Sequence, residues 1–99
     1  MGYKIKWLSD SSISYQNEID FIYLKWNYKE VEKFILLVNE NLFRLSINPF
    51  IGIPIKTIFR IVISKQTTLY YKVVIAENRI DLLFFWNNSK NPIDLAKLL

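Results

Sequence analysis

Residues 58–92 read IFRIVISKQTTLYYKVVIAENRIDLLFFWNNSKNP, which is three β-rich segments separated by polar turns. Aromatic and β-branched residues dominate the runs at 58–63, 69–75 and 80–86, and such residues favour strands. Because only short polar segments separate the runs, the pattern predicts an antiparallel β-meander. Its first loop is predicted at residues 64–68, with Ile63 opposite Leu69, and its second turn at Glu77 and Asn78. A meander with an apolar face needs a second layer to cover that face.

The polar residues of the three strands predict which face is buried. Arg60, Lys72 and Asp81 are placed together on one face, with Lys72 and Asp81 as a cross-strand ion pair. The opposite face is then the predicted core, formed by Phe59, Ile61, Ile63, Leu69, Tyr71, Val73, Ile75, Ile80, Leu82, Phe84 and Trp86. The face that holds these polar residues also holds many apolar ones. A monomer rarely leaves that much apolar surface exposed. We therefore expect a protein partner there, or else the chain's own C-terminal helix, over Ile58, Val62, Tyr70, Val74, Leu83 and Phe85.

The first half of the chain supplies a strand and a second layer. Apolar residues alternate with lysines at 3–7, which predicts a strand. A helix follows as far as Trp26, with N-caps offered by residues 10–12 and with Glu18 facing solvent. Asn27 caps a second helix that ends near residue 48, and the short link predicts an antiparallel helical hairpin. The apolar stripes of the hairpin are Tyr15, Ile19, Ile22, Tyr23 and Trp26 in the first helix, and Val31, Phe34, Ile35, Val38, Leu42 and Leu45 in the second.

These elements predict a single α+β domain over residues 1–99. It comprises an N-terminal strand, an antiparallel helical hairpin packed on a sheet, the three-strand antiparallel meander of that sheet, and a short C-terminal helix. The last helix is predicted at residues 92–98, with Asn91 as its cap. A chain of 99 residues is long enough for one core of two layers but not for two such cores.

The composition excludes several kinds of chemistry. The chain contains no cysteine and no histidine, which removes disulfides, thiol nucleophiles, the usual metal ligands and the usual base at neutral pH. Any catalysis must use Lys, Arg, Tyr, Asp, Glu, Ser or Thr, and no cofactor or metal is expected. Lys4 and Lys6 are followed by Trp7 and Leu8 and then by polar residues, not by the apolar core of a signal peptide. We therefore expect a cytoplasmic protein that makes no membrane contact.

Positive charge gathers in the second half of the chain. Residues 1–49 hold six Lys or Arg and six Asp or Glu, whereas residues 50–99 hold seven and three, which accounts for the net charge of +4. A basic sheet can attract phosphate or an acidic partner, and it can equally be an ordinary solvated face.

Several short motifs occur in a fixed order along this pattern. They are the strand that contains Trp7, LKW at 24–26, LSINP at 45–49 followed by Gly52 and Pro54, RIVIS at 60–64, LYYKV at 69–73, and WNNSKNP at 86–92. Their order and spacing resemble the RelE/ParE superfamily, the toxins of type II toxin–antitoxin modules, over nearly the whole chain. The resemblance implies a small toxin whose sheet is neutralised by a partly helical antitoxin encoded beside it, and it allows a toxin–antitoxin hetero-oligomer.

Two branches of that superfamily differ in mechanism, since one cleaves mRNA in the ribosome and the other poisons DNA gyrase without cutting anything. The positions where the nuclease branch places cations fall on Arg60, Val62, Thr68 and Ser89, of which only Arg60 is basic. Related toxins commonly close with DNRQNP, whereas this chain has NNSKNP, so that Ser89 replaces an arginine and Lys90 follows it. The resemblance favours a ParE-like toxin that acts by binding and is not an enzyme. A RelE-like ribosome-dependent mRNA endoribonuclease is the alternative, and a non-toxic, repurposed antitoxin-binding protein is a further one.

Two sets of candidate site residues follow from the resemblance. If the chain is a nuclease, several cations must replace the missing histidine, and the candidates are Arg60, Lys65 and Lys90. The residues expected to contact the target or the antitoxin are Lys56, Arg60, Val62, Tyr70, Leu83, Phe85 and Lys90.

Overall fold

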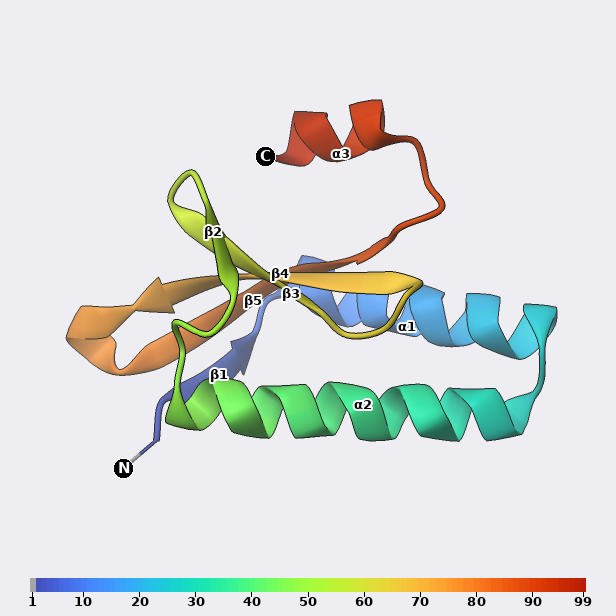
Figure 1. Ribbon diagram of the computed structural model, residues 1–99, viewed down its shortest axis with the longest axis horizontal. Coiled ribbons are helices and arrows are strands. Elements are labelled where there is room, and N and C mark those ends of the chain that lie inside the picture. The colour runs from blue at the N-terminus through green and yellow to red at the C-terminus, as the bar shows by residue number, and fades with distance from the viewer. Residues whose placement is uncertain (1) are drawn as a thin grey trace.

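A computed structural model describes residues 2–99, which form a five-stranded sheet with helices on both faces (Figure 1). The elements in chain order are β1 (Lys4–Trp7), α1 (Ser9–Lys25), α2 (Tyr28–Ile47), β2 (Ile53–Ile55), β3 (Ile58–Val62), β4 (Thr67–Val74), the 3₁₀ turn η1 (Ile75–Glu77), β5 (Arg79–Asn87) and α3 (Pro92–Leu98). The strand order is β1-β5-β4-β3-β2, with β1 parallel to β5 and the other neighbours antiparallel. The predicted α+β fold and element order are confirmed, and β2 is a strand that the pattern did not predict.

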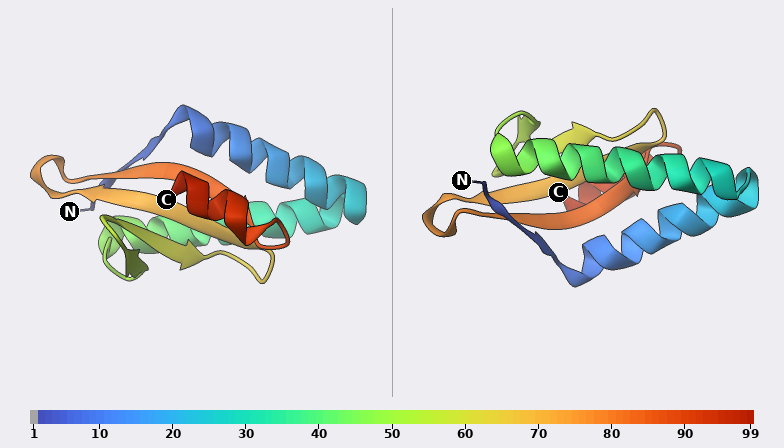
Figure 2. Two further views of the ribbon diagram at one scale, coloured as in Figure 1. Left: turned by 90° about the horizontal axis from the view of Figure 1, so that it is seen from above. Right: turned by 90° about the horizontal axis from the view of Figure 1, so that it is seen from below.

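The sheet separates two layers of helix. The hairpin of α1 and α2 covers one face, which we call the inner face, and α3 lies across the other, the outer face (Figures 1 and 2). The core sits between the hairpin and the inner face, and its most deeply buried side chains are Val38, Leu45, Leu69, Ile80 and Leu82. Burial of such apolar side chains is the main source of stability for a domain of this size.

The β3–β4 hairpin confirms the predicted faces but not the predicted register. Ile61 lies opposite Leu69 and Val62 opposite Thr68, so the loop spans residues 64–66 and not 64–68. Side chains alternate along a strand with a period of two, and a register shift of two residues leaves each of them on its predicted face. Arg60 therefore stays on the outer face.

β5 contains an irregularity that strict alternation hides. Tyr70 pairs with Phe84 but Tyr71 pairs with Leu82, so the ladder skips one residue of β5. Such a bulge reverses the faces of the residues that follow it. Phe85 is consequently buried in the core at 4% exposure, while Phe84 and Trp86 lie on the outer face. The prediction that put Phe84 and Trp86 on the inner face and Phe85 on the outer face is wrong for this reason, although Trp86 is still buried, at 8% exposure.

The turn between β4 and β5 differs from the prediction in two details. Ile75 belongs to η1 and is 64% exposed, so it is not a core residue. Asn78 follows it at φ 48°, in the left-handed region that asparagine tolerates better than most residues. Lys72 does lie opposite Asp81, but within residues 2–99 the ion pair of Asp81 is formed with Arg79, at 2.7 Å, and not with Lys72.

The start of α1 lies earlier than predicted. The helix begins at Ser9 with Leu8 as an N-cap that forms no side-chain hydrogen bond, so the predicted caps at residues 10–12 are wrong. Ser11 and Ser14 donate their hydroxyl hydrogens to carbonyls of the preceding turn instead. The Ser14 hydroxyl oxygen also accepts the backbone N–H of Phe85 at 2.8 Å. This contact fixes α1 against the bulged strand beyond the end of β1.

Gly52 and Tyr71 attach the segment before β2 to the core. Tyr71 is fully buried, and its hydroxyl donates to the carbonyl of Pro49 at 2.8 Å and accepts the N–H of Gly52 at 3.1 Å. A Cβ atom on Gly52 would collide with that hydroxyl and lie 2.7 Å from the carbonyl oxygen of Arg60, so the close approach requires glycine. Burial raises the pKa of Tyr71, and the bond from Gly52 only partly opposes this, so the hydroxyl remains a donor.

The predicted C-terminal helix and its cap are confirmed. Asn91 accepts the N–H of Ile93 with its side-chain oxygen at 3.0 Å, and Pro92 occupies the first turn of α3. Leu98 of α3 lines a shallow hollow together with Leu83 and Phe84. The chain's own C-terminal helix thus covers part of the apolar outer face. A protein partner was the first of the two covers expected for this face. No helix within residues 2–99 has the length and hydrophobicity needed to cross a membrane.

Candidate functional site

The outer face brings together the positions that the sequence singled out. Val62, Thr68 and Trp86 form one row across β3, β4 and β5, and Arg60, Tyr70 and Phe84 form the next. Residues at such cross-strand positions are direct neighbours, with Cβ atoms about 4.5–5.5 Å apart. Arg60, Val62 and Thr68 are therefore adjacent side chains of a single surface.

Arg60 is the cation at the centre of this surface. It lies on β3 between Ile53 of β2 and Tyr70 of β4, and it is half-buried. No carboxylate within residues 2–99 lies at ion-pair distance from its guanidinium group. A half-buried guanidinium group without a carboxylate partner in the described chain is suited to bind a phosphate or carboxylate group from outside.

The two aromatic rings next to Arg60 are structural. Tyr70 is only 2% exposed and stacks on Phe84, with the ring centroids 4.8 Å apart and the planes inclined by 19°. Because α3 lies over this part of the sheet (Figure 2), Tyr70 has no free surface in this conformation. Val62, at 59% exposure, is open to a partner. Of the apolar contact candidates, Phe85 is in the core and Leu83 is half-buried beside α3.

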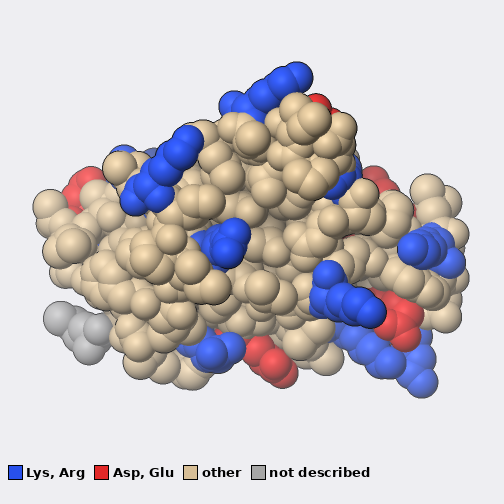
Figure 3. All heavy atoms as spheres, turned by 45° about the horizontal axis from the view of Figure 1, so that its top comes forward, with Lys and Arg blue, Asp and Glu red and all other residues tan. Residues whose placement is uncertain are grey.

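The lysine candidates lie at the edges of the outer face. Lys90 follows β5, and its Nζ atom lies 5.8 Å from the centre of the Trp86 ring, a cation–π distance. Lys56 occupies the β2–β3 turn at φ 55°, and its Nζ atom donates to the carbonyl of Leu99 at 3.1 Å. Basic side chains are scattered over the face shown in Figure 3, with neutral surface between them. On this face the basic side chains can therefore make separate contacts with a partner.

A hydrogen-bonded tract joins the β3–β4 turn to the residues after β5. Asn88 receives a bond from the Thr68 hydroxyl at 2.9 Å, donates its side-chain amide to the carbonyl of Lys65 at 3.1 Å, and donates its backbone N–H to the carbonyl of Gln66 at 2.7 Å. This arrangement brings Lys65 to the same end of the sheet as Ser89. No hydrogen bond or ion pair in the described chain joins Arg60, Lys65 and Lys90 to one another.

The side chain of Ser89 is already engaged. Its hydroxyl and its backbone N–H both donate to the side-chain oxygen of Asn87, the latter at 2.9 Å. Asn87 in turn donates to Glu18 at 3.1 Å, and Thr67 donates its hydroxyl to the same carboxylate. A chain of hydrogen bonds therefore runs from α1 to Ser89, in the tract after β5.

Glu18 is the residue that the sequence analysis misplaced. Predicted to face solvent, it is 4% exposed and lies at the centre of the cluster with Thr67 and Asn87. A signal for its burial was present, because position 18 falls between Tyr15 and Ile22 at core-facing helical spacing. Buried polar groups are nearly always hydrogen-bonded, and Thr67 and Asn87 satisfy both carboxylate oxygens here.

The chemistry available on the outer face is limited. Burial raises the pKa of Tyr15 and of Tyr71. Both tyrosines pack in the core, away from this face. Residues 2–99 contain no cluster of three or more side chains able to hold a metal ion. Arg60 can stabilise negative charge, but the neighbouring positions 62 and 68 supply a valine and a threonine.

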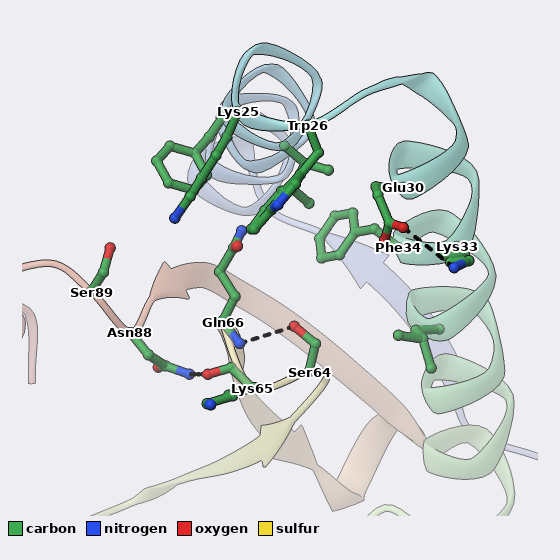
Figure 4. Close-up of a pocket in the computed structure, with 13 residues that line it drawn as sticks. Lys25, Trp26, Glu30, Lys33, Phe34, Ser64, Lys65, Gln66, Asn88 and Ser89 are labelled. Carbon is green, nitrogen blue, oxygen red and sulfur yellow. Dashed lines mark hydrogen bonds and ion pairs between the residues drawn. The ribbon is translucent and has the colours of Figure 1, made fainter.

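A separate cavity of about 820 Å³ opens at the end of the helical hairpin (Figure 4). It lies between the end of α1, the start of α2, the β3–β4 turn and Asn88–Ser89. We call it the hairpin-end pocket. The sequence analysis did not predict it, because its residues come from four separate segments and carry no common motif.

Neither protein-family models nor curated protein sequences give a significant match to this chain. Solved structures do match it. The toxin–antitoxin complex RelBE2 from Mycobacterium tuberculosis matches with a TM-score of 0.63 and 15% identity, over 89% of this chain and 100% of the matched chain. The isolated E. coli RelE toxin matches with a TM-score of 0.61 and 11% identity, over 98% and 99%.

A double arginine-to-alanine mutant of E. coli RelE in the free state matches with a TM-score of 0.61 and 12% identity, over 100% of both chains. Sequence identities this low carry no information on activity, but the coverage shows that the likeness extends over the whole domain. The chain has the fold of the RelE toxins, as its resemblance to the RelE/ParE superfamily led us to expect.

Proposed function

We propose that this protein is the toxin of a type II toxin–antitoxin module and that it inhibits growth by binding its target, DNA gyrase, in the manner of the ParE-like branch. The fold supports a toxin role, since two of the matched structures are of the RelE toxin and a third is of a toxin–antitoxin complex. The single observation that favours binding over cleavage is the composition of the outer face around Arg60.

Cleavage of RNA through its 2′ hydroxyl needs a base, an acid and cations that stabilise the charged phosphorane at one phosphate. Arg60 can supply one cation. Its neighbours Val62 and Thr68 cannot supply another, and the hydroxyl of Ser89 is directed at Asn87. One guanidinium group beside an exposed valine is suited to recognise a partner surface. It is poorly suited to transfer protons.

A cognate antitoxin is the second partner in this proposal. Large apolar side chains remain exposed on the hairpin, including Leu24 at 83%, Phe43 at 67% and Ile47 at 65%. Phe43 and Ile47 lie one turn apart near the end of α2, whereas Leu24 lies at the other end of the hairpin. Exposed apolar side chains on neighbouring turns of a helix commonly mark a protein interface. The charge of +4 favours an acidic partner, and the assembly would be a toxin–antitoxin hetero-oligomer.

The alternative is a RelE-like ribosome-dependent mRNA endoribonuclease that uses Arg60, Lys65 and Lys90. One observation favours this alternative. The hydrogen bonds of Asn88 hold the turn that contains Lys65 beside Ser89. They therefore bring two segments with candidate cations to one end of the sheet. On this reading, Arg60→Ala abolishes mRNA cleavage while the protein still folds and binds its antitoxin. Cleavage that Arg60→Ala leaves unchanged would exclude this site.

The toxin role itself is tested by expression in bacteria from an inducible promoter, with and without the reading frame that adjoins this one. We expect induction alone to stop growth and co-expression of the neighbouring frame to restore it. Growth that continues at full rate with the folded protein present would reject the toxin role and favour the non-toxic, antitoxin-binding alternative.

A further inference from the structure

The hairpin-end pocket lies between the two helices and the β3–β4 turn, and one of its walls is apolar. Its apolar wall contains the rings of Phe21, Trp26 and Phe34 (Figure 4). Trp26 is 50% exposed, although it packs edge-on against Phe21 with the ring centroids 6.5 Å apart. A half-exposed indole at the wall of a cavity offers a flat apolar surface on which a planar ligand can stack.

The polar wall of the same pocket is basic. It contains Lys25, Lys33 and Lys65, against one acidic residue, Glu30. Lys33 is paired with Glu30 at 3.3 Å, whereas no carboxylate in the described chain lies within ion-pair distance of Lys25 or Lys65. The Nζ atom of Lys25 lies 4.8 Å from the centre of the Trp26 ring. A cation is thus held beside the aromatic surface, which favours an anionic group on whatever stacks there.

Gln66 contributes an unsatisfied hydrogen-bond donor to the pocket. Its side-chain Nε2 atom is buried, yet it has no hydrogen-bond acceptor within residues 2–99. Figure 4 shows the Gln66 side chain extending from the β3–β4 turn towards Trp26 at the pocket. A buried donor without an acceptor is rare in proteins and destabilises the folded state. A ligand with an acceptor atom in its ring plane would remove this cost.

We propose that the hairpin-end pocket binds a nucleotide, with the base against Trp26, an acceptor on the base edge at the Gln66 amide, and the phosphate near Lys25 and Lys65. The volume of about 820 Å³ lies within the usual range for small-ligand sites. Stacking surface, unpaired cations and an unsatisfied amide donor together match a heteroaromatic ring that carries phosphate. The same chemistry is offered by a free nucleoside monophosphate and by one nucleotide of single-stranded RNA.

The test is calorimetric titration of the full chain with AMP, UMP and hexa-adenylate, with adenosine and inorganic phosphate as partial ligands. We expect AMP or UMP to bind more tightly than either partial ligand, and the affinity to fall as salt screens the lysines. Gln66→Met keeps the length of the side chain but removes the donor, and should weaken binding about fivefold, the value of one hydrogen bond. Lys25→Ala should weaken the binding of AMP but not that of adenosine.

Two matched variants serve as controls. Gln16→Met makes the same change on the exposed face of α1, and Lys29→Ala removes an exposed lysine of α2 that does not line the pocket. Both should bind AMP as the parent does. Tighter binding of hexa-adenylate than of AMP supports the proposal with RNA as the source, and equal binding supports it with a free nucleotide.

Several results would overturn the proposal. They are the absence of binding at millimolar nucleotide, binding of inorganic phosphate alone as tightly as AMP, and binding that neither Gln66→Met nor Lys25→Ala alters although both variants are folded. Binding of an acidic, apolar peptide in the pocket without any binding of nucleotide would assign it to a protein partner instead.

Discussion

The carboxylate of Glu18 has two structural roles. It satisfies the Thr67 hydroxyl and the Asn87 amide in the core, and through Asn87 it fixes the backbone and hydroxyl of Ser89. The tract that follows β5 is therefore positioned from α1, a helix far away in the sequence. This small cluster therefore positions the residues that the end of the sheet presents after β5.

We predict that Glu18→Ala lowers the free energy of unfolding by about 1–3 kcal/mol, because Thr67 and Asn87 each lose a buried partner. Urea denaturation measures this directly. Asp20→Ala is the matched control, since Asp20 is an exposed carboxylate of the same helix that accepts only from Gln16. Equal stabilities of the two variants would mean that the cluster contributes nothing.

Gly52 has a role of a different kind, because its missing side chain makes room for the Tyr71 hydroxyl. We predict that Gly52→Ala destabilises the protein by about 1–3 kcal/mol, the usual cost of overpacking. Thermal or urea unfolding of this variant, beside Thr57→Ala in the exposed neighbouring turn, checks the prediction. A variant as stable as the parent would show that Tyr71 can move aside without loss.

At the level of elements, the N-terminus of α2 shows how local sequence specifies local structure. Asn27 accepts the N–H of Glu30 at 3.0 Å, as the pattern of residues 27–30 predicted. We expect Asn27→Ala to lower the free energy of unfolding by about 0.5–2 kcal/mol. Asn39→Ala, an exposed change in the middle of the same helix, should cost much less. A similar loss from both variants would argue against a capping contribution.

The β4–β5 turn should make stability depend on pH. Hydrogen bonds from Arg79 hold the pKa of Asp81 below its ordinary value, with smaller contributions from Lys6 and Lys72. A carboxyl whose pKa is lowered on folding contributes stability above its unfolded pKa and loses it as the pH falls through the folded value. Asp81→Asn should therefore destabilise the protein near neutral pH.

This difference between parent and Asp81→Asn should shrink as the pH falls below about 4. Unfolding at a series of pH values measures it, with Asp94→Asn on exposed α3 as the control. A difference that is constant over the acid range would show that the Arg79 pair does not stabilise the fold.

Sequence reasoning succeeded where a pattern is local and failed where a contact is distant. The stripe of α2, the Asn27 and Asn91 caps and the faces of β3 and β4 follow from periodicity and capping chemistry alone. The predicted stripe of α1 is right only in part, because Tyr23 and Trp26 are exposed. The bulge before Phe85 depends on how β5 meets β1, β4 and Ser14, which no alternation pattern encodes. The burial of Glu18 and the hairpin-end pocket likewise arise from segments that only the fold brings together.

At the level of the whole molecule, the fold and the outer face support different parts of the functional proposal. The fold is that of RelE toxins across nearly all of the chain, and this supports a toxin. The outer face has Arg60 at its centre, and the neighbouring positions 62 and 68 hold a valine and a threonine in place of further cations. This composition favours the proposal of action by binding. The sequence predicted that Arg60, Val62 and Tyr70 share a face, and it offered the C-terminal helix as one cover for that face. It placed Phe85 there as well, although the bulge in β5 turns Phe85 into the core.

The most direct test of this account compares two assays on the same purified protein. We predict that it inhibits supercoiling by DNA gyrase, that Arg60→Ala weakens this inhibition more than the exposed control Lys97→Ala does, and that mRNA on ribosomes remains intact. Cleavage of ribosome-bound mRNA with no effect on gyrase would contradict the account and assign the protein to the nuclease alternative.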